Sequence, residues 1–134
     1  MNGLKVIIAF VCGFFVAQAI KTVIAAIKHK KNLKQYLVRS GGMPSGHMAS
    51  TAAAATCIGL MGGFDSLVFA LAVCVGMTVF YDAVNVRYAV GKQGEALNKL
   101  LDEPLKVVEG HNLVQNIVGV FLGVAVGIAV FLVF

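Results

Sequence analysis

Residues 41–61 read GGMPSGHMASTAAAATCIGLM and join a glycine-rich turn to an apolar helix. Glycine lets backbone N–H groups turn toward a ligand, and a helix start adds unpaired donors and the positive end of a dipole. His47 supplies a group that can give or take a proton near neutral pH. The segment predicts either an anion site suited to phosphate chemistry or a plain loop-to-helix turn with an incidental histidine.

The composition indicates an integral membrane protein with one domain over residues 1–134. Hydrophobic residues make up 59% of the chain and charged residues 13%, whereas a soluble domain carries roughly 25% charged residues. Four apolar stretches near bilayer-crossing length occupy residues 4–27, 44–61, 64–86 and 112–134. We therefore expect an all-α polytopic bundle of about four transmembrane helices.

The first apolar stretch also resembles a secretory signal peptide, because Ala17-Gln18-Ala19 is typical of a cleavage site. The apolar run nevertheless continues to Ile27, and a basic cluster follows it directly. We therefore expect this stretch to be retained as the first span.

The distribution of positive charge predicts the orientation. Nine of the eleven Lys and Arg residues lie in two segments between apolar runs, at 28–39 and 87–106, and the turn at 62–65 has none. By the positive-inside rule, both basic loops should be cytoplasmic and both termini should lie outside the cell membrane. Such loops suit anionic lipid headgroups. The sequence has no basic patch interleaved with aromatic residues of the kind that would indicate nucleic-acid binding.

Two further patterns concern packing. Gly119, Gly123 and Gly127 share one helix face and permit close helix approach, within the chain or between the protomers of a homodimer. Residues 94–105 have apolar residues at near-helical spacing, which predicts a short amphipathic helix at the interface, ended or kinked by Pro104. The three cysteines lie inside apolar runs and fit no metal-ligand spacing.

Ionisable residues cluster toward the cytoplasmic ends of the spans, where such residues are costly and are candidates for function. Each span contributes to this cluster, which contains Lys21, His47, Asp82, Arg87 and His111, with Gln115 four residues after His111 on the same helix face. Structural alternatives remain open. Lys21 can extend to the interface, Asp82 and Arg87 can form a structural ion pair, His111 can cap its helix, and Gln115 can bond between helices.

A zinc site is the first functional alternative, since two histidines and one aspartate are potential ligands. The histidines are far apart in the sequence, no His-x-x-x-His pair exists, and the neighbouring cations would repel a metal. We therefore expect neither a metal nor another cofactor.

At Pro44-Ser45-Gly46-His47 the chain resembles the central motif of the type 2 phosphatidic acid phosphatase (PAP2) superfamily, which includes the vanadium haloperoxidases. It resembles the small divergent PAP2-related membrane proteins more closely. The further stretches that carry this likeness are Tyr81-Asp82-Ala83 through Val86-Arg87, Gly91-Lys92-Gln93 with Leu97-Asn98, and Gly110-His111.

This resemblance implies a metal-free hydrolase acting on a phospholipid or prenyl phosphate in the bilayer, either a monoester or a diphosphate. His111 would attack phosphorus to form a phosphohistidine, and His47 would protonate the leaving alcohol. The phosphate would be held by Ser45, Gly46, Lys21, Arg87 and Lys92, of which Lys21 and Arg87 are assigned by chemistry rather than by motif spacing. Cations there would stabilise the charge on the transferring oxygens.

The chain departs from the superfamily pattern. The usual first motif is absent, Leu105 stands where the last motif has arginine, and Gln115 replaces the acid that orients the nucleophilic histidine. A neutral amide can orient an imidazole but cannot supply negative charge. Either Asp82 or Glu109 supplies it, or turnover is weak, or the protein binds phosphate or a lipid headgroup without catalysis. A small transporter is less favoured, because the outer halves of the spans are nearly all apolar.

Overall fold

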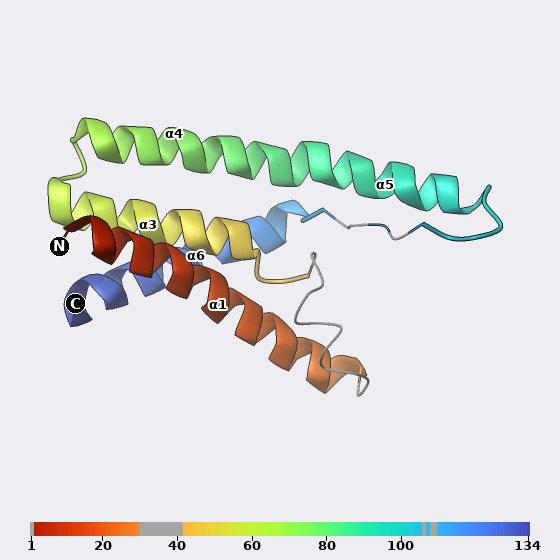
Figure 1. Cartoon of the computed structure of the whole chain (residues 1–134), viewed down its shortest axis with the longest axis horizontal. Helices are drawn as coiled ribbons and strands as arrows, with labels where there is room; N and C mark the ends of the chain where they lie inside the picture. Colours follow the sequence, from red (N-terminus) through yellow and green to blue (C-terminus); the bar gives the residue numbers. More distant parts are fainter. Residues whose placement is uncertain (1, 30–41, 106, 108–109) are drawn as a thin grey trace.

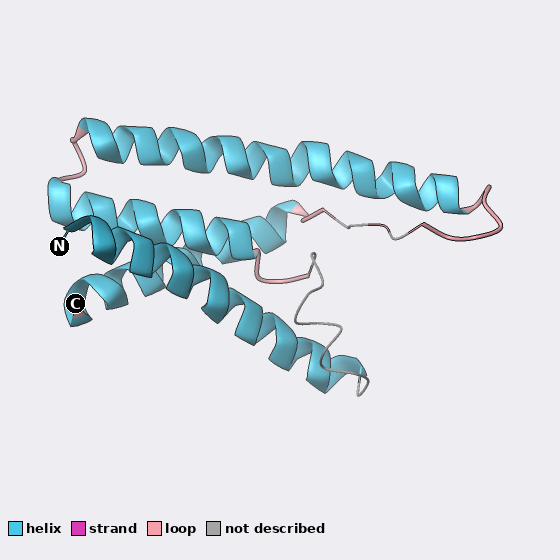
Figure 2. Cartoon of the chain, in the orientation of Figure 1, coloured by secondary structure: helices cyan, strands magenta, loops and turns pink. Residues whose placement is uncertain are grey.

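The computed structural model describes residues 2–29, 42–105, 107 and 110–134. In order along the chain these residues form α1 Asn2–His29, α3 Gly46–Gly62, α4 Leu67–Tyr81, the π-helix η1 Asp82–Val86, α5 Arg87–Asn98 and α6 Leu113–Val133. The described part contains helices and no strand (Figures 1 and 2). The expected all-α bundle with about four long helices is confirmed.

Three of these helices are long and apolar enough to cross a membrane, over Gly3–Ile27, Leu67–Asn98 and Leu113–Val133. At 17 residues, α3 is shorter than the roughly 20 residues that a simple span needs. It nevertheless packs among the others and contacts α1, α4 and α6 (Figure 1). The helix that begins at the glycine-rich turn is therefore the centre of the bundle.

The glycine ladder of α6 lies directly against α3. A Cβ atom added to Gly119 would lie 2.7 Å from the carbonyl oxygen of Ser45, and one added to Gly127 would lie 2.6 Å from that of Ala53. Gly123 faces the carbonyl of Ala49 in the same way. This ladder therefore brings two helices of one chain together.

α1 also packs against α3, through a second row of small residues. Ala9, Gly13 and Ala17 recur every four residues on α1, and both alanines are fully buried. A Cβ atom on Gly13 would lie 2.6 Å from the Ala49 carbonyl oxygen. The alanine-rich α3 thus packs against two small-residue faces, which meet at the Ala49 carbonyl.

The third span differs from expectation, because α4, η1 and α5 form one continuous helix that runs past the bundle (Figure 1). The expected separate helix at 94–105 is wrong. Residues 94–98 end α5, and residues 99–105 form turns and loop. The Asn98 side chain donates to the Leu105 carbonyl at 2.9 Å and accepts from the Leu105 N–H at 2.8 Å. A side chain that bonds the backbone in this way competes with further helix.

After this turn the chain runs back along α5. A Cβ atom added to Gly94 would collide with the Val107 side chain, and Gly110 packs against the backbone of Arg87 and Tyr88. Glycine is needed at 110 because a side chain there would collide with that backbone. This contact brings His111 back to the junction of η1 and α5.

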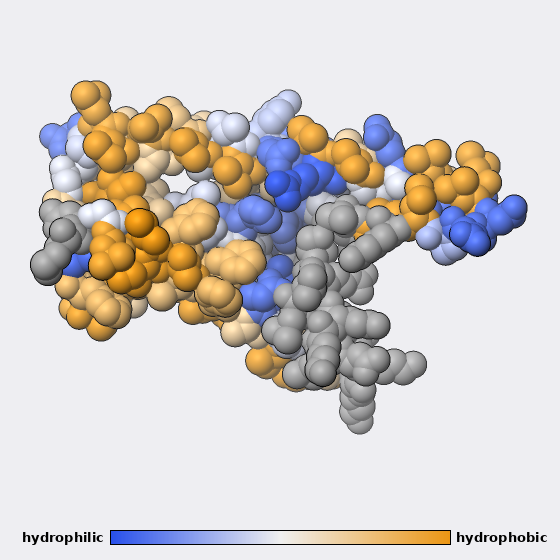
Figure 3. Space-filling view, viewed as in Figure 1, coloured by the Kyte–Doolittle hydropathy of each residue, from blue (hydrophilic) through white to orange (hydrophobic). Residues whose placement is uncertain are grey.

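Apolar surface gathers toward the end of the molecule that holds both termini, and polar surface lies near its middle (Figure 3). The α3–α4 turn lies at the same end as the termini (Figure 1). The start of α3, the π-helix and the start of α6 all lie toward the other end. Their polar side chains thus form one layer at the edge of the apolar part.

Candidate functional site

The glycine-rich turn is tied to both α1 and α6. Ser45 is fully buried and caps α3, with its Oγ accepting from the Met48 N–H at 3.5 Å. Its own N–H donates to the backbone carbonyl of Gln115 at 3.1 Å. Gly42 has φ +83°, and a Cβ atom added to it would lie 3.6 Å from Cγ of Lys21. The turn therefore joins the Lys21 side chain to the first turn of α6.

The start of α6 carries a capping box that also orients His111. The Gln115 N–H donates to Asn112 Oδ1 at 2.9 Å, and the Asn112 N–H donates to Gln115 Oε1 at 3.2 Å. The same Gln115 Oε1 lies 3.3 Å from His111 Nδ1. The structural alternative predicted a hydrogen bond from the Gln115 side chain to another helix. The side chain instead bonds to residues at the start of its own helix.

These contacts fix which ring nitrogen of His111 carries the proton. A backbone N–H can only donate, so the Gln115 atom that it reaches must be the carbonyl oxygen. That oxygen can only accept, so His111 Nδ1 must be the protonated nitrogen. The neutral imidazole then has its free electron pair on Nε2, the state that a nucleophile requires.

His111 is buried, and positively charged side chains act on it. The imidazole is buried, with 5% of its surface exposed, and this burial lowers its pKa. The charges of Lys21, His47 and Arg87 lower the pKa further, while the hydrogen bond to Gln115 raises it. Because these side chains act on one imidazole, the structure brings together groups from α1, α3, α5 and the start of α6.

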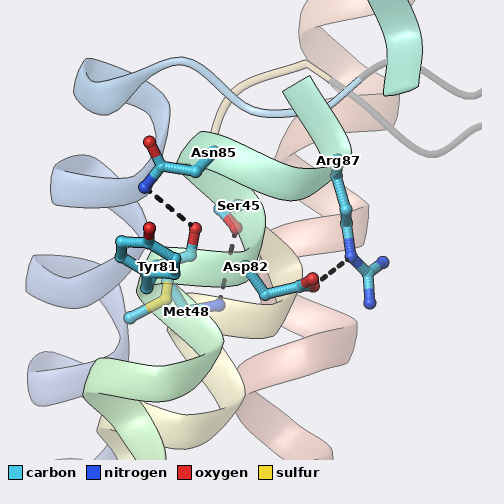
Figure 4. A network of polar contacts seen from close by, with 6 residues as sticks. All are labelled: Ser45, Met48, Tyr81, Asp82, Asn85 and Arg87. Atoms are coloured by element: carbon cyan, nitrogen blue, oxygen red, sulfur yellow. Dashed lines mark hydrogen bonds and ion pairs between the residues drawn. The ribbon is translucent and has the colours of Figure 1, made fainter. Parts of the chain in front are cut away.

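The π-helix adds the acidic member of this layer. A π-helix has wider turns than an α-helix, so residues five apart become neighbours. Arg87 Nε donates to Asp82 Oδ2 at 2.6 Å, with both side chains partly exposed (Figure 4). The ion pair expected as the structural alternative is therefore formed, and it does not stop Arg87 from acting on His111.

Of the two acids considered as replacements for the missing carboxylate, Asp82 pairs with Arg87, while Gln115 holds His111 Nδ1. Glu109 lies outside the described residues, as do Gly41 and the basic residues at 30–39. Within the part of the chain that is described, no group of three or more His, Cys, Asp and Glu residues is arranged to hold a metal ion.

Lys92 is not among the cations that lower the pKa of His111. Its Nζ is 3.0 Å from Glu95 and 5.9 Å from the centre of the Tyr88 ring. Together with Asn112 and Gln115 it lines a polar pocket of about 180 Å³ between α5 and the start of α6. Gln115 thus stands between this pocket and His111.

Sequence reasoning missed the parts that position the site. The role of Asn112 was not predicted from the sequence, although Asn-x-x-Gln before an apolar run is a helix-capping pattern. Asn98 and Gly110 hold the returning loop, and no local pattern predicts their partners. Asn116 is fully buried, and neither polar atom of its side chain has a partner among the described residues.

A family model described as the Divergent PAP2 family matches residues 3–126. The chain belongs to that family. It is also 36% identical over 85 residues to a protein named uncharacterized membrane protein YuiD, from Bacillus subtilis (strain 168). That match covers 63% of this chain and 54% of the relative, so it spans about half the length of the relative. No solved structure matches the chain.

Membership of the Divergent PAP2 family confirms the resemblance found at Pro44-Ser45-Gly46-His47 and makes the chain a PAP2-related membrane protein. Its several apolar helices agree with a multi-pass arrangement. The family match includes every candidate site residue, from Lys21 to Gln115.

Proposed function

We propose that this member of the Divergent PAP2 family hydrolyses a lipid phosphate monoester or diphosphate through a phosphohistidine on His111. The observation that carries the proposal is the hydrogen bond of His111 Nδ1 to Gln115, which leaves Nε2 as the free nucleophilic nitrogen. A nucleophile oriented by a second side chain is the arrangement that covalent catalysis requires.

The phosphate is held by cations and by helix starts. Lys21 and Arg87 lie close enough to lower the pKa of His111, so their charge reaches the reacting centre. The first turns of α3 and α6 begin beside each other, since Ser45 bonds to Gln115. Their unpaired N–H groups and dipole ends favour an anion, and they stabilise the charge that builds up on the phosphoryl oxygens.

The reaction proceeds in two displacements. His111 Nε2 attacks phosphorus, the bond from phosphorus to the leaving oxygen breaks, and protonated His47 gives that oxygen its proton. Water then attacks the phosphohistidine, His47 takes a proton from the water, and inorganic phosphate leaves as the bond to Nε2 breaks. An imidazole can both donate and accept a proton, so His47 can take both roles.

A second candidate is a protein that binds phosphate or a lipid headgroup without turning it over. The observation that favours it is the neutral Gln115, which orients His111 without stabilising the imidazolium that forms during attack. We also propose that the site faces the cytoplasm, because Arg87, Lys92 and Lys99 lie toward the site end of the molecule.

The test is phosphate release by purified protein in lipid nanodiscs from phosphatidate, phosphatidylglycerophosphate and a prenyl diphosphate. His111→Ala should abolish release from every substrate. His47→Ala should abolish release from these lipids yet retain the first displacement on an aryl phosphate, seen as a burst of the aryl alcohol, because that leaving group needs no proton while the attack of water still needs His47. Mass spectrometry should detect phosphohistidine at residue 111 after rapid quenching at alkaline pH.

Three results would refute hydrolysis through His111. These are release that survives His111→Ala, loss of the aryl alcohol burst in His47→Ala, and no release from any substrate by folded wild-type protein. In the third case, phosphate binding by the same sample would establish the non-catalytic alternative.

A further inference from the structure

A deep apolar groove runs along the membrane part of the chain beside the polar layer. It lies between α4 on one side and α3 and α6 on the other, and its volume is about 660 Å³. No residue of α4 is buried, so this helix packs only loosely against the bundle. Figures 1 and 3 show α4 standing off from the rest of the bundle along this length. The volume is within the range of cavities that hold small ligands.

The near end of the groove adjoins two site residues along the chain. Met48 lines it on α3 directly after His47, and Tyr81 lines it on α4 directly before Asp82. Figure 4 draws Met48 and Tyr81 in one view with the ion pair of Asp82 and Arg87. A molecule in the groove would therefore have one end among cations and the other among hydrocarbon side chains.

The length of the groove suits one extended hydrocarbon chain. Its lining on α3 extends from Met48 to Leu60, which is about 18 Å at 1.5 Å per helical residue. The hydrocarbon core of a bilayer is about 30 Å thick, so the groove runs through more than half of it. The far end is lined by Phe64 in the α3–α4 turn, and the near end lies toward the polar layer.

We propose that this groove holds one hydrocarbon chain of the lipid whose phosphate occupies the site at Lys21, Arg87 and His111. This inference rests on the proposed function and adds the place and direction of the lipid chain. The apolar lining selects hydrocarbon, the cations toward the near end select phosphate, and the length lets one chain extend as far as the α3–α4 turn. The end of the lipid chain then lies near Leu60 and Phe64.

Gly76 offers a way to fill the groove without disturbing the fold. It lines the groove, and a Cβ added there would meet no atom within 4 Å. Gly76→Phe should occupy the path of the lipid chain, and Gly76→Ala controls for the change in helix propensity. Cys74→Phe adds the same ring to an exposed position of α4 that does not line the groove.

The experiment uses nanodiscs of phosphatidylcholine with a small fraction of phosphatidate that carries a photoreactive diazirine at the end of one acyl chain. Cross-linked peptides are mapped by mass spectrometry in the full chain and in His111→Ala, which cannot turn the probe over. We expect labelling around Leu60 and Phe64 in both proteins. Gly76→Phe should reduce it at least fivefold, whereas Gly76→Ala and Cys74→Phe should stay within twofold.

A probe with the diazirine next to the headgroup should instead label near Met48 and Tyr81, which tests the direction of the chain. Labelling unchanged in Gly76→Phe, in protein whose thermal midpoint is unchanged, would overturn the proposal. So would cross-links from the groove to a second copy of the chain in place of lipid. Hydrolysis with no groove labelling would refute the groove alone, and groove labelling without hydrolysis would refute the hydrolase alone.

Discussion

Replacing Gln115 with glutamate tests the link between His111 and its orienting side chain. Glutamate can accept from the Asn112 N–H and from His111 Nδ1 as the amide does, so the capping box stays intact. The change adds one negative charge 3.3 Å from the imidazole. An opposite charge at such a distance shifts a pKa by about 1–3 units, or roughly 1.4–4 kcal/mol between the two protonation states.

We therefore expect the pKa of His111 to rise by about 1–3 units in Gln115→Glu, against the lowering caused by burial and by Lys21. The assay is an NMR titration of protein labelled with ¹³C and ¹⁵N at histidine, in detergent micelles. The chain has three histidines, and His111→Asn assigns the signal. Gln93→Glu on the exposed surface of α5 is the matched control, because it adds the same charge away from His111.

The wild-type spectrum is itself a test. The ¹⁵N shifts of His111 should show a proton on Nδ1 and none on Nε2 at pH 8. A proton on Nε2, or a pKa of His111 that is unchanged or lower in Gln115→Glu, would refute the reasoning that Gln115 sets the state of this imidazole. If the protein is a hydrolase, Gln115→Glu should also speed formation of the phosphohistidine, since a carboxylate stabilises the imidazolium.

The remaining predictions concern stability. Gly123→Ala should lower the thermal midpoint, because the new methyl would meet the backbone of α3 and overpacking costs about 1–3 kcal/mol. Gly76→Ala, where the added methyl meets no atom, should leave the midpoint unchanged, and equal midpoints in the two variants would contradict the packing of α6 on α3. Asn98→Ala removes two hydrogen bonds worth about 1 kcal/mol each, so the Leu105 amide should exchange its hydrogen roughly 10–30-fold faster, and unchanged exchange would show that another contact holds the loop. Burial lowers the pKa of His111, so the unfolded chain binds more protons than the folded protein between that lowered pKa and about 6.5. The free energy of unfolding should therefore fall as the pH drops through this window. His111→Asn should remove this part of the pH dependence, and an identical slope in the variant would disprove the role of His111.

The helices of the bundle could be predicted from the sequence because each is a local pattern. Apolar runs of sufficient length indicate spans, and glycines four residues apart indicate a close helix contact. The sequence left open whether that contact lies within the chain. The answer depends on α3, whose own small residues accept both the glycine face of α6 and Gly13 of α1.

The continuous helix from Leu67 to Asn98 could not be predicted in the same way. The polar residues after Tyr81 read as the end of a span, yet the backbone continues through the π-helix and carries Asp82 and Arg87 to the site. The end at Asn98 depends on contacts with residues 105–110, which lie close only after the chain has turned back. Local spacing contains no information on such a return.

The departure at Gln115 has different consequences for the fold and for the chemistry. A capping box accepts glutamine or glutamate at this position, so the start of α6 loses nothing by the exchange of an acid for an amide. The charge of the layer does change, because Lys21 and Arg87 then face Asp82 as the one acid seen among the described site residues. An excess of positive charge strengthens the binding of a phosphate dianion, while the missing carboxylate leaves the imidazolium of His111 less stabilised during attack. Gln115 should therefore favour tight binding over fast turnover, and Gln115→Glu should shift the protein in the opposite direction, with a higher Kd for inorganic phosphate and a higher kcat.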